Sequence, residues 1–267
     1  GREESMSVAV ILGSAFGEAV LGGQALDLAI VPTRFGDADL YRYPSGGEDA
    51  YVIFRHGVPH RWLPNQIPYR AHAAALRVVD CQALLVTSSV GVLDPELPLD
   101  RPLPIGDLLM PDNRLPDGSA CTMFATPDEN QYHLVLDEGL ISGPLTDQLE
   151  ELARQESLEP APRAVFAYTP GPRNKSAADN VFWSRAGAQL NSMTVGPELV
   201  LANELGILCA AVGVGHKYSA PGQHDRLESD AMADSLETGR RIIETLATAF
   251  LEGARPVAFG NRFYHYE

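Results

Sequence analysis

Four short polar motifs in this chain each follow an apolar run, and their side chains could together bind an anion. The motifs are Gly13-Ser14-Ala15-Phe16-Gly17, Arg55-His56-Gly57-Val58-Pro59-His60, Thr87-Ser88-Ser89-Val90-Gly91 and Ser192-Met193-Thr194. In an open α/β sheet, ligands bind at the carboxyl ends of the strands. Hydroxyls, backbone N–H groups, an arginine and one or two histidines at that edge would form an oxyanion or phosphate cradle. The sequence therefore predicts an enzyme that holds a phosphate group.

Each motif also has an ordinary structural explanation when it is taken alone. The glycine pair around Ser14 suits a tight turn, and it matches neither G-x-G-x-x-G nor a P-loop. An arginine at a strand end, such as Arg55, often forms a surface salt bridge, and Met193-Thr194 suits a core residue followed by a helix cap. The hydroxyls of residues 87–89 are costly at the end of a buried strand unless they cap a turn or bind a ligand. The succession of all four motifs favours the ligand site.

The elements that must position these motifs alternate between strands and helices. Strands are predicted at residues 7–12, 51–55, 83–88, 163–168, 189–193 and 209–215. Helices are predicted at residues 69–80, 143–155, 177–186, 197–205 and 230–251, the last with an amphipathic stripe. Residues 94–116 predict a long ordered loop around a short strand at 108–110. This order favours parallel strand pairing in one α/β domain over residues 6–267, with residues 1–5 a tag remnant.

Composition narrows the expected partners and location. The chain of 267 residues carries a formal charge of −15 at pH 7. Such a surface repels a nucleic-acid backbone, although a local pocket of arginine and N–H groups can still hold a small anion. Three cysteines without a CxxC pair predict neither disulfides nor a metal site, and no apolar run reaches the roughly 18 residues of a membrane span. We therefore expect a soluble, cytoplasmic protein that binds neither nucleic acid nor a membrane.

Further short motifs accompany these four along the chain. They are Tyr69, Leu85-Val86 before Thr87, Gly106-Asp107, Gly171-Pro172-Arg173, Asn191 before Ser192, Pro197-Glu198-x-x-x-Ala202 and Gly206-Ile207. In this order, over most of residues 8–220, the sequence resembles the trimeric purine nucleoside phosphorylase and 5′-methylthioadenosine phosphorylase family. The resemblance implies a three-layer α/β/α fold with a mixed, strongly curved central sheet, and a homotrimer.

The resemblance also implies a role for particular side chains. It places phosphate on Ser14, Arg55, His56, Ser88, Ser89 and Thr194. It places the nucleoside beside Met193, His60, Gly91, Tyr168, His216, Lys217 and Ser219. The residues expected to act in catalysis are Arg55 and His56 at the phosphate, and His216 and Lys217 at the base. Inorganic phosphate is then a co-substrate, and no other cofactor or metal is implied.

The sequence departs from the family at the base. Adenosine-type members have aspartates after the strand at 209–215 and 6-oxopurine members an asparagine, whereas this chain has His216-Lys217. The glutamate that reads the ring in 6-oxopurine enzymes is replaced by residues 174–176, Asn-Lys-Ser. His216 and Lys217 could be solvent-facing loop residues paired with Asp225 or Glu228. Alternatively, His216 donates a proton near neutral pH and Lys217 donates toward a 6-oxo group or another acceptor.

The reaction implied is phosphorolysis of a purine or purine-like nucleoside to the free base and pentose 1-phosphate. The sugar could be 5′-modified, as in methylthioadenosine or methylthioinosine. Two alternatives stay open: a nucleosidase that uses water, and a non-catalytic relative that only binds. Retention of Arg55, His56 and Thr194 argues against water, since water needs no anion cradle, whereas the missing carboxylates keep the non-catalytic alternative open. His133 and His224 are candidates for the 5′ pocket, and the aromatic tail at 253–267 has no predicted function.

Overall fold

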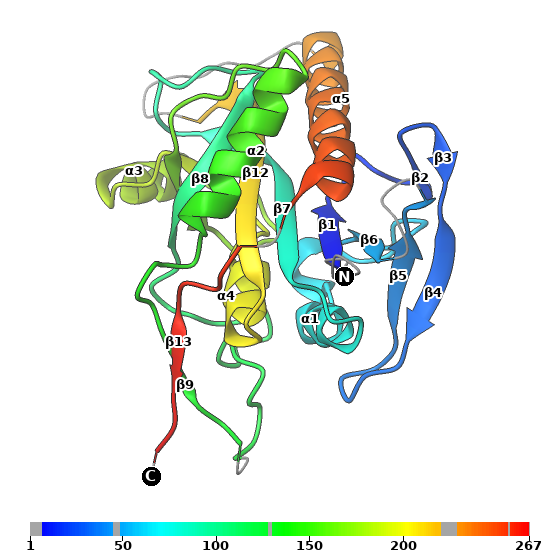
Figure 1. Ribbon diagram of the computed structural model, residues 1–267. Coiled ribbons are helices and arrows are strands. Elements are labelled where there is room, and N and C mark those ends of the chain that lie inside the picture. The colour runs from blue at the N-terminus through cyan, green and yellow to red at the C-terminus, as the bar shows by residue number, and fades with distance from the viewer. Residues whose placement is uncertain (1–6, 45–48, 128–129, 220–228, 256, 267) are drawn as a thin grey trace.

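A nine-stranded mixed sheet forms the centre of the molecule. The computed structural model describes residues 7–44, 49–127, 130–219, 229–255 and 257–266 (Figure 1). Within these residues the strand order is β11 (Leu190–Ser192), β10 (Ala164–Tyr168), β8 (Pro102–Leu109), β12 (Leu208–Tyr218), β7 (Ala83–Val92), β1 (Val8–Leu12), β6 (Ala50–Phe54), β5 (Ala38–Arg42) and β4 (Asp27–Val31). The pairs β6–β1, β1–β7, β7–β12, β8–β10 and β10–β11 are parallel, and β8–β12, β4–β5 and β5–β6 are antiparallel. The sheet is therefore mixed, as the family resemblance implied.

Half of this sheet closes on itself. Strand β11, at one end of the order, also pairs with β7 in antiparallel fashion, with Asn191 opposite Gly91 and Leu190 opposite Val92. Strands β7, β12, β8, β10 and β11 therefore form a closed ring, while β1, β6, β5 and β4 extend from it as an open sheet. Closure requires strong curvature, which confirms the curved sheet that the resemblance implied.

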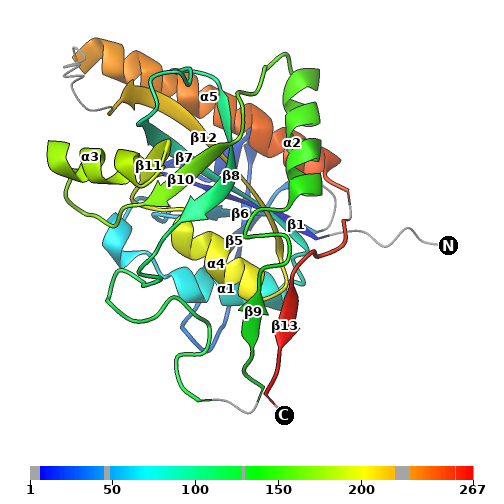
Figure 2. The ribbon, with the colours of Figure 1, turned by 90° about the vertical axis from the view of Figure 1, so that its left-hand side faces the viewer.

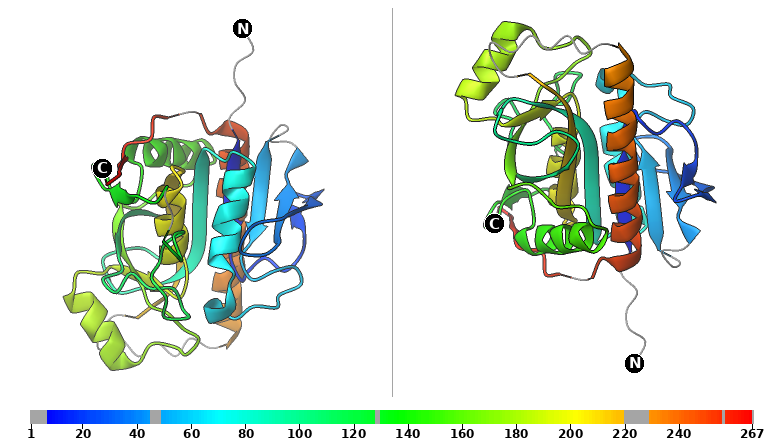
Figure 3. Two further views of the ribbon diagram at one scale, coloured as in Figure 1. Left: turned by 90° about the horizontal axis from the view of Figure 1, so that it is seen from below. Right: turned by 90° about the horizontal axis from the view of Figure 1, so that it is seen from above.

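Helices cover both faces of the sheet. Helices α1 (Tyr69–Val78) and α4 (Gly196–Glu204) pack on one face through Ala75, Leu76 and Leu199. Helices α2 (Gly143–Gln155) and α5 (Ser229–Gly253) pack on the other, where Leu149 and Phe250 are buried. Figure 3 shows the two pairs from opposite sides of the molecule. The three-layer α/β/α fold is thus confirmed.

Helix α3 (Ala177–Arg185) lies at one end of the sheet beside β10 and β11 (Figure 2). None of its residues is fully buried, and Trp183 packs against a small core cluster of Leu93, Ala167 and Ala188. Its first turn is fixed by a capping box: Ser176 Oγ accepts from the Asp179 N–H at 3.0 Å, and the Asp179 carboxylate accepts from the Ser176 N–H at 2.9 Å.

Smaller elements complete the described chain. They are β2 (Val20–Leu21) with β3 (Gln24–Ala25), the 3₁₀ turn η2 (Pro64–Gln66), and β9 (His133–Val135) with β13 (Arg262–Tyr264). The β9–β13 pair projects beyond the sheet (Figure 2), and the Phe263 ring packs 4.5 Å from that of Tyr132. No helix among the described residues is both long and apolar enough to cross a bilayer.

Three strands are longer than the sequence predicted. Strand β7 continues to Val92, so Ser88 and Ser89 lie within it; β12 continues to Tyr218, so His216 and Lys217 lie on a strand and not in a loop. Strand β8 begins at Pro102, within the segment that was predicted as a loop before the short strand at 108–110. The extensions of β7 and β12 pair with each other, and β8 pairs first with β12 and then with β10, so these polar segments keep backbone hydrogen bonds. Strands β4 and β5 were not predicted.

Candidate active site

One cavity of about 500 Å³ collects most of the side chains that the sequence singled out. Its lining includes all six predicted phosphate residues, together with His60, Gly91, Met193, His216 and Lys217. Ser14 and Arg55 follow the carboxyl ends of β1 and β6, and Ser88 and His216 lie on the later parts of β7 and β12. The site is therefore at the sheet edge where ligands bind in α/β proteins.

Arg55 is the most deeply buried charge of the site, with 1% of its surface exposed. Its Nε and Nη2 donate to the two carboxylate oxygens of Glu198 at 2.6 and 2.9 Å, and Nη2 also donates to the Thr87 carbonyl at 2.8 Å. The remaining Nη1 lies beside Gly13, where an added Cβ would come within 2.9 Å of it. Glu198 thus holds the guanidinium plane in one orientation and directs Nη1 toward the turn that carries Ser14.

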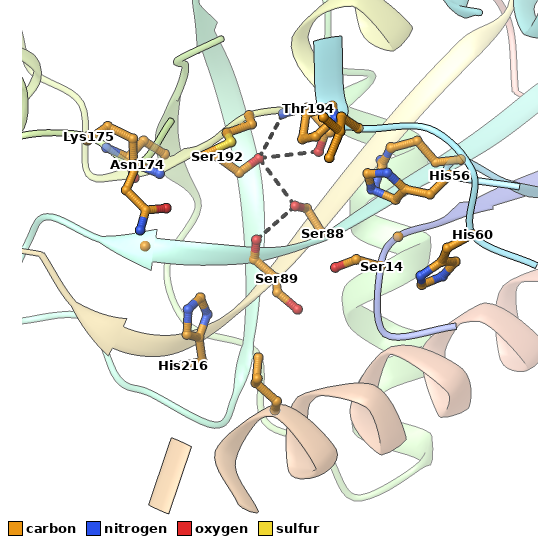
Figure 4. A pocket seen from close by; sticks show the side chains of 18 of the residues that line it. Ser14, His56, His60, Ser88, Ser89, Asn174, Lys175, Ser192, Thr194 and His216 are labelled. Atoms are coloured by element: carbon orange, nitrogen blue, oxygen red, sulfur yellow. Dashed lines mark hydrogen bonds between the residues drawn. The ribbon is translucent and has the colours of Figure 1, made fainter. Parts of the chain in front are cut away.

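Three hydroxyl groups meet in this cavity (Figure 4): one from Ser88 on β7, and two from Ser192 and Thr194 at the end of β11. Ser88 Oγ lies 3.2 Å from Ser192 Oγ, and Ser192 Oγ lies 3.4 Å from Thr194 Oγ1 and 3.3 Å from the Thr194 backbone nitrogen. All three side chains are buried, which is favourable because they bond to one another. Ser192 was part of a recognised motif but was not predicted as a site residue.

The turn that carries Thr194 into α4 is strained. Val195, the residue before the helix, has φ +74° and ψ −53°, a conformation that β-branched side chains rarely adopt. Its side chain is fully buried, so packing in the core holds the backbone in this conformation. Strain of this kind is concentrated at functional sites, where it fixes the direction of a neighbouring group.

Two histidines line the same end of the cavity. His56 Nδ1 lies 2.8 Å from the Trp62 carbonyl oxygen, so Nδ1 is the protonated nitrogen and Nε2 carries a lone pair when the ring is neutral. Burial, the largest effect, lowers the pKa of His56 below its usual value. His60 Nε2 donates to the Phe16 carbonyl at 2.9 Å, which leaves its Nδ1 as an acceptor.

The far end of the cavity is lined by nitrogen-rich side chains: Asn174, Lys175, Asn191, His216 and Lys217 (Figure 4 labels three of them). Burial, with help from Lys217 and Lys175, lowers the pKa of His216 to about 4. A pKa lowered this far favours the neutral ring and disfavours proton donation by His216 as an imidazolium near neutral pH, so the catalytic role of His216 stays a prediction. Lys175 and Asn174 were noted in the sequence only as occupants of the missing glutamate's segment.

Two predicted nucleoside residues lie outside the lining of this cavity. The Tyr168 ring is buried against the start of α4, since a Cβ on Gly196 would come 2.7 Å from Tyr168 Cβ. Ser219 donates its N–H to the Val92 carbonyl at 2.7 Å and so continues the β7–β12 ladder behind Gly91. His133, a candidate for the 5′ pocket, lies on β9 bonded to the Tyr266 hydroxyl, and His224 falls outside the described residues.

Comparison with known proteins agrees with this fold and gives the family of the chain. A family model for the phosphorylase superfamily matches residues 7–252. The S-methyl-5′-thioadenosine phosphorylase of Anopheles gambiae is 27% identical, over 90% of this chain and 88% of its own. A probable S-methyl-5′-thioinosine phosphorylase of Methanopyrus kandleri is 34% identical, over 68% of each chain. A solved mutant of Schistosoma mansoni adenosine/methylthioadenosine phosphorylase, in complex with methylthioadenosine, has a TM-score of 0.80 at 19% identity, covering 94% of this chain and 93% of its own.

The family match covers nearly the whole of the described fold, and the chain belongs to the phosphorylase superfamily. Within that superfamily its relatives are nucleoside phosphorylases, which confirms the class of enzyme predicted from the sequence.

Proposed function

We propose that this protein transfers the pentosyl group of a purine-type nucleoside to inorganic phosphate, releasing the free base and pentose 1-phosphate. The observation that carries the proposal is the buried Arg55, which Glu198 orients so that Nη1 points to the Ser14 turn beside the hydroxyls of Ser88 and Thr194. A buried guanidinium is costly unless its charge is paired and its N–H groups are hydrogen-bonded. A water nucleophile would need no such cationic cradle.

The reaction follows from the order of groups along the cavity. A phosphate oxygen forms a bond to C1′ of the pentose while the bond from C1′ to the base nitrogen breaks, and its electron pair leaves with the base. Positive charge develops on the sugar, which the phosphate held at Arg55 stabilises from one side. Met193 and Gly91 also line the cavity, and the sugar is expected beside them.

His56 acts in this scheme as an acceptor. With Nδ1 donating to Trp62, a neutral His56 presents the Nε2 lone pair, which suits a P–OH group or a sugar hydroxyl and not a bare phosphate oxygen. The ring would thereby favour the monohydrogen form of phosphate in the orientation that turns an ionised oxygen toward C1′.

An apolar part of the lining suits a modified sugar. Trp62, Leu63 and Leu236 line the cavity beside His60. A 5′ substituent such as methylthio would bury apolar surface there, whereas a free 5′ hydroxyl would not.

Assembly and location belong to the same proposal. We infer one nucleoside phosphorylase-like domain over residues 6–267, assembled as a homotrimer in the cytoplasm. The exposed position of Leu63, 54% accessible at the rim of the cavity, supports a neighbouring subunit there, and the three buried free thiols suit a reducing compartment. Light scattering on the purified protein tests the trimer; a monomeric mass would contradict it.

The test of the reaction is release of free base from inosine, guanosine, adenosine, methylthioadenosine and methylthioinosine, each with and without phosphate. We expect cleavage that depends on phosphate and yields pentose 1-phosphate. Equal cleavage without phosphate would identify a nucleosidase, and binding without cleavage would identify a non-catalytic relative; either result overturns the proposal.

A further inference from the structure

Lysine is almost absent from this protein. The sequence contains only two lysines, Lys175 and Lys217, against 18 arginines. The two residues come from different parts of the fold, since Lys175 precedes α3 and Lys217 lies on β12, yet both line the same cavity. Both lysine ammonium groups of the chain therefore lie at this cavity, and all its other permanently charged cationic side chains are arginines.

The two lysines also differ from the arginines in their partners. In the described part of the chain every ion pair involves an arginine, and neither lysine has a carboxylate partner. Each lysine contributes to the low pKa of His216, and Lys217 helps to lower the pKa of Lys175, so the three groups lie within electrostatic range of one another. Two like charges near each other and partly removed from water are unfavourable without an anion or acceptor between them.

The two lysines and His216 lie at the end of the cavity that is opposite to the proposed phosphate cradle. Figure 4 shows His216, Asn174 and Lys175 at one end, and Ser14, His56 and Thr194 at the other. If phosphate occupies the cradle and the sugar lies between, the lysines are next to the base. Nearby, Asn191 Oδ1 and His216 Nδ1 are buried without a hydrogen-bond partner in the described part of the chain.

We propose that Lys175 and Lys217 form a clamp that selects nucleosides whose base presents carbonyl oxygens, and not an exocyclic amine, to this end of the cavity. The inference rests on the proposed function and names its substrate class. An ammonium group only donates hydrogen bonds, so an amino group opposite it leaves both unpaired, whereas a carbonyl oxygen accepts from it. The clamp also acts in the reaction: the electron pair of the broken C1′–N bond spreads onto the carbonyl oxygens of the leaving base, and two ammonium groups stabilise that charge.

Steady-state kinetics with inosine, xanthosine and adenosine test this selection in the presence of phosphate. We expect kcat/KM for the two oxo bases to exceed that for adenosine by at least about 10-fold, because a hydrogen bond to a charged group is at stake. In the Lys175→Met and Lys217→Met variants, kcat/KM for the oxo bases falls by about 10–100-fold and that for adenosine changes little. Arg185→Met, which removes the same charge from an exposed position outside the cavity, leaves all three values unchanged.

A second measurement does not depend on turnover. In protein labelled with ¹³C at the lysine ε-carbons, only two side-chain signals exist, and the two Met variants assign them. Addition of hypoxanthine or xanthine with phosphate is expected to shift both signals, and addition of adenine to shift neither. Phosphate-dependent cleavage that prefers adenosine, or lysine signals that ignore oxo bases, would overturn the clamp. Shifted signals without cleavage of any nucleoside would support the clamp and overturn the proposed reaction.

Discussion

At the scale of the residue, the site depends on which atoms a side chain leaves free. Arg55 engages Nε and Nη2 with Glu198 and Thr87, so a single nitrogen is left for the proposed phosphate site. His56 Nδ1 donates to the Trp62 carbonyl, which leaves Nε2 as the acceptor of the neutral ring, and burial lowers the pKa of His216. The residue types were visible in the sequence, but the roles follow from the partners.

Arg55→Lys tests the role of the bidentate pair. Lysine keeps the positive charge but cannot bond both Glu198 oxygens and still direct a third donor to the Ser14 turn. We expect kcat/KM for phosphate to fall by about 10–100-fold, the loss that accompanies removal of one charge-assisted hydrogen bond. Arg61→Lys, in the same loop but outside the cavity lining, is the control and retains wild-type kinetics. Equal kinetics for the two variants would contradict the assignment.

At the scale of the element, α3 has little core contact, and the segment before it depends on a helix cap. No residue of α3 is buried, and the reciprocal bonds between Ser176 and Asp179 define its first turn. Lys175 immediately precedes this cap, so the order of the helix end and the position of the ammonium group are linked.

Removing the cap should therefore affect substrate binding more than overall stability. Ser176→Ala is expected to lower the local stability of α3 by about 1 kcal/mol and to raise the KM of the nucleoside, with kcat nearly unchanged. Hydrogen exchange of the amides at 177–185, together with KM, measures both effects. Ser142→Ala removes the N-cap of α2, which is packed on the core, and should lower the melting temperature without changing KM. The prediction fails if Ser176→Ala leaves exchange and KM unaltered.

At the scale of the whole molecule, a strongly acidic protein carries a small cationic region inside one cavity. The formal charge is −15, while Lys175 and Lys217 face the same enclosed space. The negative surface does not prevent a local cationic site that binds hydrogen-bond acceptors. The cavity walls reduce the screening of the two lysine charges by bulk solvent. Such a site is unfavourable for folding when no ligand is bound.

The pH dependence of the free energy of unfolding should reveal this destabilisation by the lysine charges. Burial, and secondarily Lys217, lowers the pKa of Lys175 from 10.5 to about 8. Below pH 8 the group is charged in both states and destabilises the fold; between pH 8 and 10.5 the folded state sheds the proton first, so stability rises with pH. Lys175→Met is thus expected to unfold at higher urea concentration than wild type at pH 7, with the difference shrinking by about pH 10. Arg185→Met should show no such trend, and a Lys175→Met protein less stable at pH 7 would indicate a structural role.

Local pattern in the sequence determined much of the fold. Apolar runs and proline or serine at helix starts located five helices and most strands of the ring, since hydrophobic periodicity and capping act within a few residues. The exposed edge was missed: in β4, Leu28 and Ile30 are exposed, so the strand lacks the buried pattern that identifies one. The six residues predicted to bind phosphate line one cavity, and the sequence singled them out because each follows a strand or lies within one.

The tertiary structure alone decided the rest. The pairing of Glu198 with Arg55, the meeting of Ser88 with Ser192 and Thr194, and the gathering of both lysines join segments from separate strands and helices. Closure of β11 onto β7 brings several of these segments together, and it depends on registers between distant strands. A sequence pattern specifies which face of an element is apolar, but which elements meet is a property of the packed chain.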